Sequence, residues 1–188
     1  MTTNQLFNVY DKAQKEQLIL GINRNIDITY FANPSYSAEQ MEQIRIGIID
    51  NLNILFYAYP KFSPKQMEQI RFGLIQKLDV SIYADPQFSW RQMEQIRLGL
   101  HLNLPIAHYL TRNYSWRKMR EIRVGLENKL DPSIFATPEY NWRQVKELVS
   151  GLLLGVDISA YNDPLIDWKK MRKEKLDLFM YLEMHRDN

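Results

Sequence analysis

The sequence predicts an all-α protein, an α-solenoid of about six 26-residue repeats in which one long helix and one short helix alternate. Two observations predict this fold class. Six of the seven glycines stand 26 residues apart, and the hexapeptide Gln-Met-Glu-Gln-Ile-Arg that begins at Gln40 returns unchanged at Gln66 and Gln92. It returns in weaker form at Lys118 and Gln144. We expect a curved, right-handed stack with polar terminal caps, because each repeat buries its apolar sides against its neighbours.

Each long helix is expected to begin after a side chain that caps its first turn, since such a side chain accepts hydrogen bonds from the N–H groups there. These residues are Ser37, Ser63, Ser89, Ser115, Asn141 and Asp167. In the helix that follows Ser63, the spacing of Met67, Ile70 and Leu74 makes one apolar stripe, and Phe72 stands on another side. A helix with apolar residues on two sides is packed on two sides.

The short element follows an aspartate. In the segment from Asp79 to Pro86, Asp79 is expected to cap one or two helical turns and Pro86 to end them. An aromatic residue here, such as Tyr83, is expected to fill the space between layers. The periodic glycine lies on a flank of the long helix, where the missing Cβ is expected to let another backbone come close.

The repeat register predicts three regions: an N-terminal cap at 1–13, tandem repeats at 14–169 and a capping helix at 170–188. The units start near residues 14, 40, 66, 92, 118 and 144. In the last region Asp177 replaces the periodic glycine and Glu174 replaces the apolar residue before it. Terminal repeats of solenoids normally have such a polar outer face.

The best-defined unit, residues 82–100, combines Tyr-Ala-Asp-Pro with Phe-Ser-Trp, Gln-Met-Glu-Gln-Ile-Arg and Gly-Leu. It resembles a short tandem helical repeat of proteins of bacterial mobile genetic elements, and the resemblance covers roughly residues 14–169. It implies a repeat fold and a phage, plasmid or conjugative-element context. It also implies no catalytic residues. In that context we expect an inhibitor or adaptor that acts on a host defence or replication complex.

Composition narrows the function classes. The 188 residues carry a net charge of +2 and include no cysteine, which excludes a disulfide framework and a cysteine-bound metal. No signal peptide or membrane span is apparent, so we expect a cytoplasmic protein without membrane contact. The three histidines form no metal or catalytic motif, and no phosphate-binding or dinucleotide motif occurs. We therefore predict a non-enzymatic protein with no cofactor and no metal.

A row of arginines recurs once per unit at Arg45, Arg71, Arg97 and Arg123. It is either a line of cations along a groove or a structural row. We favour the structural interpretation for the first three, because each has a glutamate three residues earlier on the same helix. Arg123 has Arg120 at that place, so we expect it to face a partner.

All four tryptophans stand at the first position of a long helix, at Trp90, Trp116, Trp142 and Trp168. They either stack on bases or anchor a peptide, or they pack between repeats, which we favour. A second basic row follows directly after this position. It consists of Lys65, Arg91, Arg117, Arg143 and Lys169.

The most basic segment is 112–123, in which aromatic residues interleave with cations. Together with the neighbouring tryptophans and arginines it supplies the candidate binding residues. These are Arg112, Tyr114, Trp116, Arg117, Lys118, Arg120, Arg123, Trp90, Arg91, Trp142 and Arg143. The same unit departs from the repeat at Pro105, which replaces the capping aspartate, and at Thr111-Arg112, which replaces Asp-Pro.

The leading hypothesis is a repeat protein that binds another protein or complex through its stacked surface. The alternative is binding of an RNA or DNA backbone by segment 112–123. A base-reading code is not supported, because repeat proteins of that kind vary two or three side chains between units. Here Gln40, Gln66 and Gln92 are constant. The oligomeric state is left open by the sequence.

Overall fold

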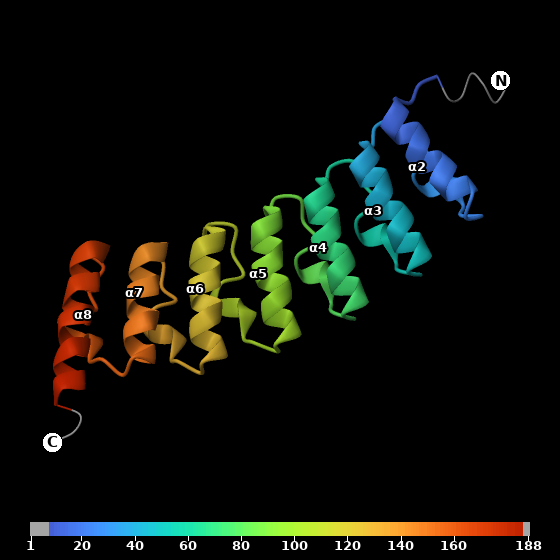
Figure 1. Ribbon diagram of the computed structural model, residues 1–188. Helices are drawn as coiled ribbons and strands as arrows, with labels where there is room; N and C mark the ends of the chain where they lie inside the picture. Colours follow the sequence, from blue (N-terminus) through green and yellow to red (C-terminus); the bar gives the residue numbers. More distant parts are fainter. Residues whose placement is uncertain (1–7, 186–188) are drawn as a thin grey trace. The chain divides into compact units, whose positions relative to one another are not determined.

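The computed structural model describes residues 8–185, and within this range the chain is all-helical, with no strand. Long helices alternate with three-residue 3-10 turns (Figure 1). The long helices are α2 (Lys12–Ile22), α3 (Ala38–Ile49), α4 (Pro64–Ile75), α5 (Trp90–His101), α6 (Trp116–Glu127), α7 (Trp142–Leu153) and α8 (Trp168–Met184). The predicted helical-repeat solenoid is confirmed.

The short elements are single 3-10 turns rather than one or two turns of α-helix. They are η1 (Ile28–Tyr30), η2 (Ile54–Phe56), η3 (Val80–Ile82), η4 (Ile106–His108), η5 (Pro132–Ile134) and η6 (Ile158–Ala160). The predicted aspartate caps are confirmed, and Asn53 fills the same place before η2. Pro105 gives η4 no side-chain cap, as its lack of a hydrogen-bonding group requires.

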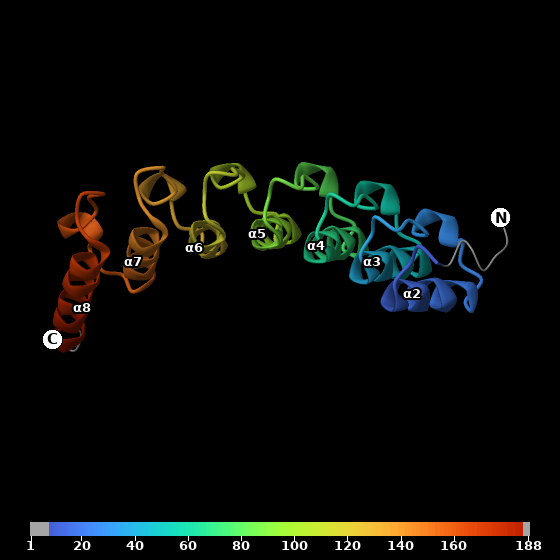
Figure 2. The same ribbon diagram turned by 90° about the horizontal axis from the view of Figure 1, so that it is seen from above.

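The chain divides into two compact units, one ending at Arg97 and the other beginning at Leu98. Within each unit the long helices form one row and the 3-10 turns form a second row (Figure 2). Helices that are successive in the sequence pack against each other, as α3 does on α4 and α6 on α7. The curvature and hand of the stack stay predictions.

The capping residues of the long helices act as predicted, and the third helical residue adds a second function. The Ser63 hydroxyl accepts from the Gln66 backbone, and the Gln66 side chain accepts in turn from the Ser63 N–H. The Gln66 amide also donates to the carbonyls of Pro86 and Phe88, at 3.0 and 2.6 Å. One glutamine therefore both caps its own helix and holds the loop of the next repeat.

The periodic glycine makes room for an aromatic ring and not for another backbone, which corrects the sequence-based expectation. A Cβ on Gly73 would lie 1.9 Å from the Tyr83 hydroxyl oxygen, and one on Gly125 would lie 2.4 Å from Phe135 Cζ. Tyr83 and Phe135 are fully buried. The ring ten residues downstream occupies the site that a side chain at the glycine would need, so the glycine is required in every repeat where this ring docks.

The boundaries drawn from the repeat register fall inside helices, because α2 begins at Lys12 and α8 at Trp168. Residues 1–7 and 186–188, parts of the two predicted caps, lie outside the described residues. The first part of α8 has a polar surface, where the Lys173 ammonium pairs with Asp177. Its last turns expose Met180, Tyr181 and Met184, so the predicted polar cap is only partly polar.

Candidate functional site

The arginine row is structural, but its partners differ from those expected. Arg45 Nε donates to Gln17 Oε1 at 3.0 Å, and Arg71 Nε donates to Gln43 Oε1 at 3.1 Å. Arg97 contacts Gln69 in the same way. Each bond joins a helix to the preceding one, across 28 residues of sequence. The expected ion pairs with the glutamate three residues earlier are not present for these three arginines in the described chain.

Arg123 is paired on its own helix, which corrects the premise that it lacks a local partner. Its guanidinium forms an ion pair with Glu127, one turn later on α6. Only 13% of the Arg123 side chain is exposed. The local pairing that seemed to be missing at i−3 is supplied at i+4, a position equally close on a helix surface.

Lys118, another residue of the predicted patch, is buried. It stands where the other repeats have the capping glutamine, and it is 5% exposed. Its ammonium donates to the carbonyls of Thr137 and Pro138 at 2.7 and 3.3 Å and lies 3.9 Å from the centre of the Tyr114 ring. Burial lowers the pKa of Lys118 to about 8. Lys118 thus holds the next loop, as the glutamines do.

The exposed cations of segment 112–123 are Arg112, Arg117 and Arg120. Arg120 Nη1 lies 3.3 Å from a carboxylate oxygen of Glu121. Tyr114 and Trp116 are half-buried. The structure therefore does not present the segment as one continuous basic patch, because two of its five cations, Lys118 and Arg123, are largely covered and are paired within the fold.

A different arrangement of cations is clear in the second unit. The guanidinium carbon of Arg117 lies 4.7 Å from the centre of the Trp116 ring and 5.5 Å from that of Trp142. Arg143 lies 4.9 Å from Trp142 and 5.2 Å from Trp168, and the Lys169 ammonium lies 5.9 Å from Trp168. These distances are those of cation–π contacts. We call the six residues Trp116, Arg117, Trp142, Arg143, Trp168 and Lys169 the cation–indole strip.

The strip places half-buried indoles beneath exposed charges, since Arg117, Arg143 and Lys169 are all exposed. In the first unit the Trp90 ring has the same surroundings, with Lys65 at 4.8 Å and Arg91 at 4.5 Å. The tryptophans are therefore partly packed, as favoured, and the cations of the second basic row lie on them at the surface, where a partner can reach them. The indoles hold the cations, and the cations face solvent.

Sequence reasoning placed Trp168 and Lys169 in their rows but omitted them from the candidate binding residues. The structure joins them to Trp142 and Arg143 through α7 and α8. The signal was available, because both residues stand 26 positions after Trp142 and Arg143.

A buried carboxylate also escaped the sequence analysis. Glu121 stands where Gln17, Gln43 and Gln69 accept a hydrogen bond from an arginine 28 residues later. In this repeat Val149 occupies the place of that arginine. Glu121 is 8% exposed, and burial raises the pKa of its carboxyl group. The exposed Arg120 is its ion-pair partner, whereas one repeat later Glu147 pairs with the buried Lys175 at 2.5 Å.

Within residues 8–185 no cluster of three or more histidine, aspartate or glutamate side chains could hold a metal ion. No helix in this range is long and apolar enough to cross a membrane. Comparisons with protein-family models, curated proteins and solved structures found no match to the chain. The cation–indole strip is therefore the candidate site on geometric grounds.

Proposed function

We propose that this chain is a non-enzymatic helical-repeat protein that binds another protein through its stacked surface, with the cation–indole strip as the contact. The observation that supports it is the repetition, on α6, α7 and α8, of an exposed cation fixed above an indole. Tryptophan and arginine are the residues most enriched at energetically important positions of protein interfaces. A mobile-element origin and an inhibitor or adaptor role fit such a surface and are part of the proposal.

The helix dipole does not favour the positions of these cations, although each cation contacts an indole. Arg117, Arg143 and Lys169 are the second residues of their helices, and the first turns of α6, α7 and α8 contain no acidic residue. A cation in the first turn of a helix opposes the helix dipole. The same unfavourable placement recurs in three successive helices. This recurrence favours a binding role for the charges.

Comparative affinity capture tests the proposal. Wild-type chain, the strip variant Arg117→Glu/Arg143→Glu/Lys169→Glu and a control variant are each used to capture proteins from the same lysate. The control reverses three exposed cations that follow the C-terminal ends of long helices, Arg24, Lys77 and Lys129. We expect the strip variant, and not the control, to lose bound proteins. Equal capture by the strip variant and the wild type contradicts the proposal.

Binding of a nucleic-acid backbone is the second candidate, and the exposure of Arg112, Arg117 and Arg120 on or next to α6 favours it. It has less support, because Lys118 donates to a backbone carbonyl of the next loop and Arg123 pairs with Glu127. A gel shift with single- and double-stranded DNA and RNA tests it. Backbone binding must weaken steeply with added salt, and no shift at micromolar protein and low salt excludes it.

A further inference from the structure

We propose that the strip binds an acidic α-helix of a partner protein, with one carboxylate for each repeat. This inference rests on the proposed function and specifies the chemistry of the partner. It depends on three properties of the strip: the sign of its charge, the way in which the indoles are occupied and the distance between successive cations.

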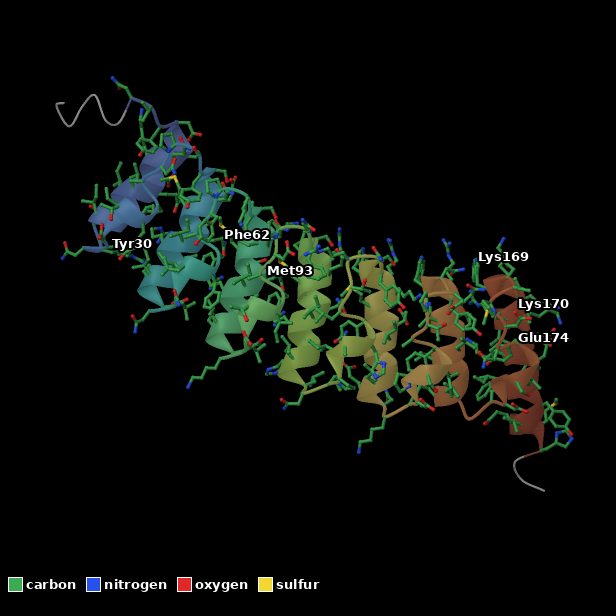
Figure 3. The ribbon with its side chains drawn as sticks, turned by 180° about the vertical axis from the view of Figure 1, so that it is seen from behind. Tyr30, Phe62, Met93, Lys169, Lys170 and Glu174 are labelled. Carbon is green, nitrogen blue, oxygen red and sulfur yellow. The ribbon has the colours of Figure 1, made fainter. Side chains whose placement is uncertain are left out.

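The charge is complementary to an acidic partner. The three cations of the strip are exposed, and each is held beside its own indole within 6 Å of the ring centre. Cations held in this way lose little conformational freedom when a carboxylate binds, since the ring already restricts the long side chain. Figure 3 shows Lys169 at the end of α8 where the helix begins.

The indoles are not available for bases. Trp142 lies within 5.5 Å of both Arg117 and Arg143, and Trp168 lies within 5.9 Å of both Arg143 and Lys169. Binding of single-stranded nucleic acid depends on aromatic faces on which bases stack. With two cations already over each of these rings, the aromatic part of such a site is occupied.

Acidic residues interrupt the same edge of the unit. Glu139 and Asp163 stand in the loops before α7 and α8, and Asp167 caps α8; all three are exposed. A continuous phosphate backbone would pass close to these carboxylates and be repelled. A partner whose negative charges are separated by about one repeat can place each carboxylate beside a cation and away from these acidic side chains.

The interval follows from helix packing. α6 packs on α7 and α7 on α8, and packed helices lie about 8–10 Å apart. The strip residues repeat once per helix, so successive cations have about the same spacing. An α-helix rises about 1.5 Å per residue, so residues seven apart share a face and lie about 10.5 Å apart. Carboxylates at every seventh position of a helix therefore match the cations of the strip.

The test uses two labelled, alanine-rich helical peptides of identical composition. In one, three glutamates stand seven residues apart; in the other they stand five residues apart and point in different directions. A 20-nucleotide single-stranded DNA is the third probe. Fluorescence anisotropy at low salt measures binding to the full-length wild type, the strip variant and the control variant. A neutral variant, Arg117→Gln/Arg143→Gln/Lys169→Gln, guards against a charge-reversal effect on folding.

We expect the seven-spaced peptide to bind wild type and control equally, and to bind the strip variant about tenfold more weakly. The neutral variant should give an intermediate loss. Equal binding of the two peptides, tighter binding of the DNA than of either peptide, or binding of no probe overturns the acidic-helix inference. The proposed function fails separately, when captured proteins are unaffected by the strip variant.

Discussion

The docking of each tyrosine against the glycine of its own repeat can be tested at Gly73. Replacement by alanine adds a Cβ that would lie 1.9 Å from the Tyr83 hydroxyl oxygen and 2.8 Å from Val80 Cγ1. Ordinary contacts of a Cβ begin at 3.4 Å, so the Tyr83 ring must move outward. The ring is fully buried. Protein interiors are close-packed, so we expect its movement to disturb neighbouring side chains.

The expected magnitude follows from three opposing effects. Alanine in place of glycine stabilises a helix by about 1 kcal/mol. Overpacking a filled core costs about 1–3 kcal/mol. Displacement of Tyr83 also lengthens the hydrogen bond from its hydroxyl to the Gln69 carbonyl, now 3.2 Å, which contributes about 1 kcal/mol. We therefore expect Gly73→Ala to lower the free energy of unfolding by roughly 1–3 kcal/mol.

Urea denaturation followed by circular dichroism measures the change, and a double-mutant cycle with Tyr83→Phe identifies its source. Without the hydroxyl, the nearest atoms to the new Cβ are Val80 Cγ1 at 2.8 Å and the ring carbon Cζ at 3.2 Å. Gly73→Ala should then cost less than in the wild type, by about 1 kcal/mol. If Gly73→Ala is as stable as wild type, or if the two substitutions are additive, the docking argument is wrong.

Three further predictions concern stability and are checked by thermal or denaturant melts. Lys77 has a φ of 57°, in the left-handed region, so Lys77→Gly should stabilise by about 1 kcal/mol; an unchanged melt would show that the strain is absent. Glu121 has a raised pKa, so wild-type stability should fall as the pH rises from about 4.5 through that raised value. Glu121→Gln should remove this fall and be more stable at pH 7, and parallel pH profiles of the two proteins would contradict the reasoning. Met93 is fully buried, so Met93→Asp should unfold the neighbouring repeats, and an unchanged melting temperature would show that the register is wrong.

Residues that act within one or two turns were predictable from the sequence. The capping oxygens of Ser63 and Asp79 were identified from their positions, because a cap bonds to N–H groups two or three residues away. The apolar stripe of Met67 and Ile70 was identified for a similar reason, since helical periodicity places both on one side. Each of these features depends on backbone geometry that is common to all helices.

Contacts between repeats were not predictable in the same way. The sequence indicates that Arg45 and Lys118 are cations, but their partners lie 28 and 19 residues away, at Gln17 and Thr137. Which atoms meet there depends on the angle and distance at which two helices pack. A local pattern carries no information about either quantity, so a neighbouring glutamate seemed to be the natural partner of Arg45.

By itself, the sequence determined the period, the helical class, the caps and the positions of the tryptophan and cation rows. The tertiary structure decided which charges remain on the surface. It buried Lys118 against the next loop, paired the partly exposed Arg123 with Glu127, and left Arg117 and Arg143 exposed beside indoles. The physical reason is that exposure is set by what the next repeat covers, and long side chains of the same charge reach either solvent or a neighbouring carbonyl according to that packing.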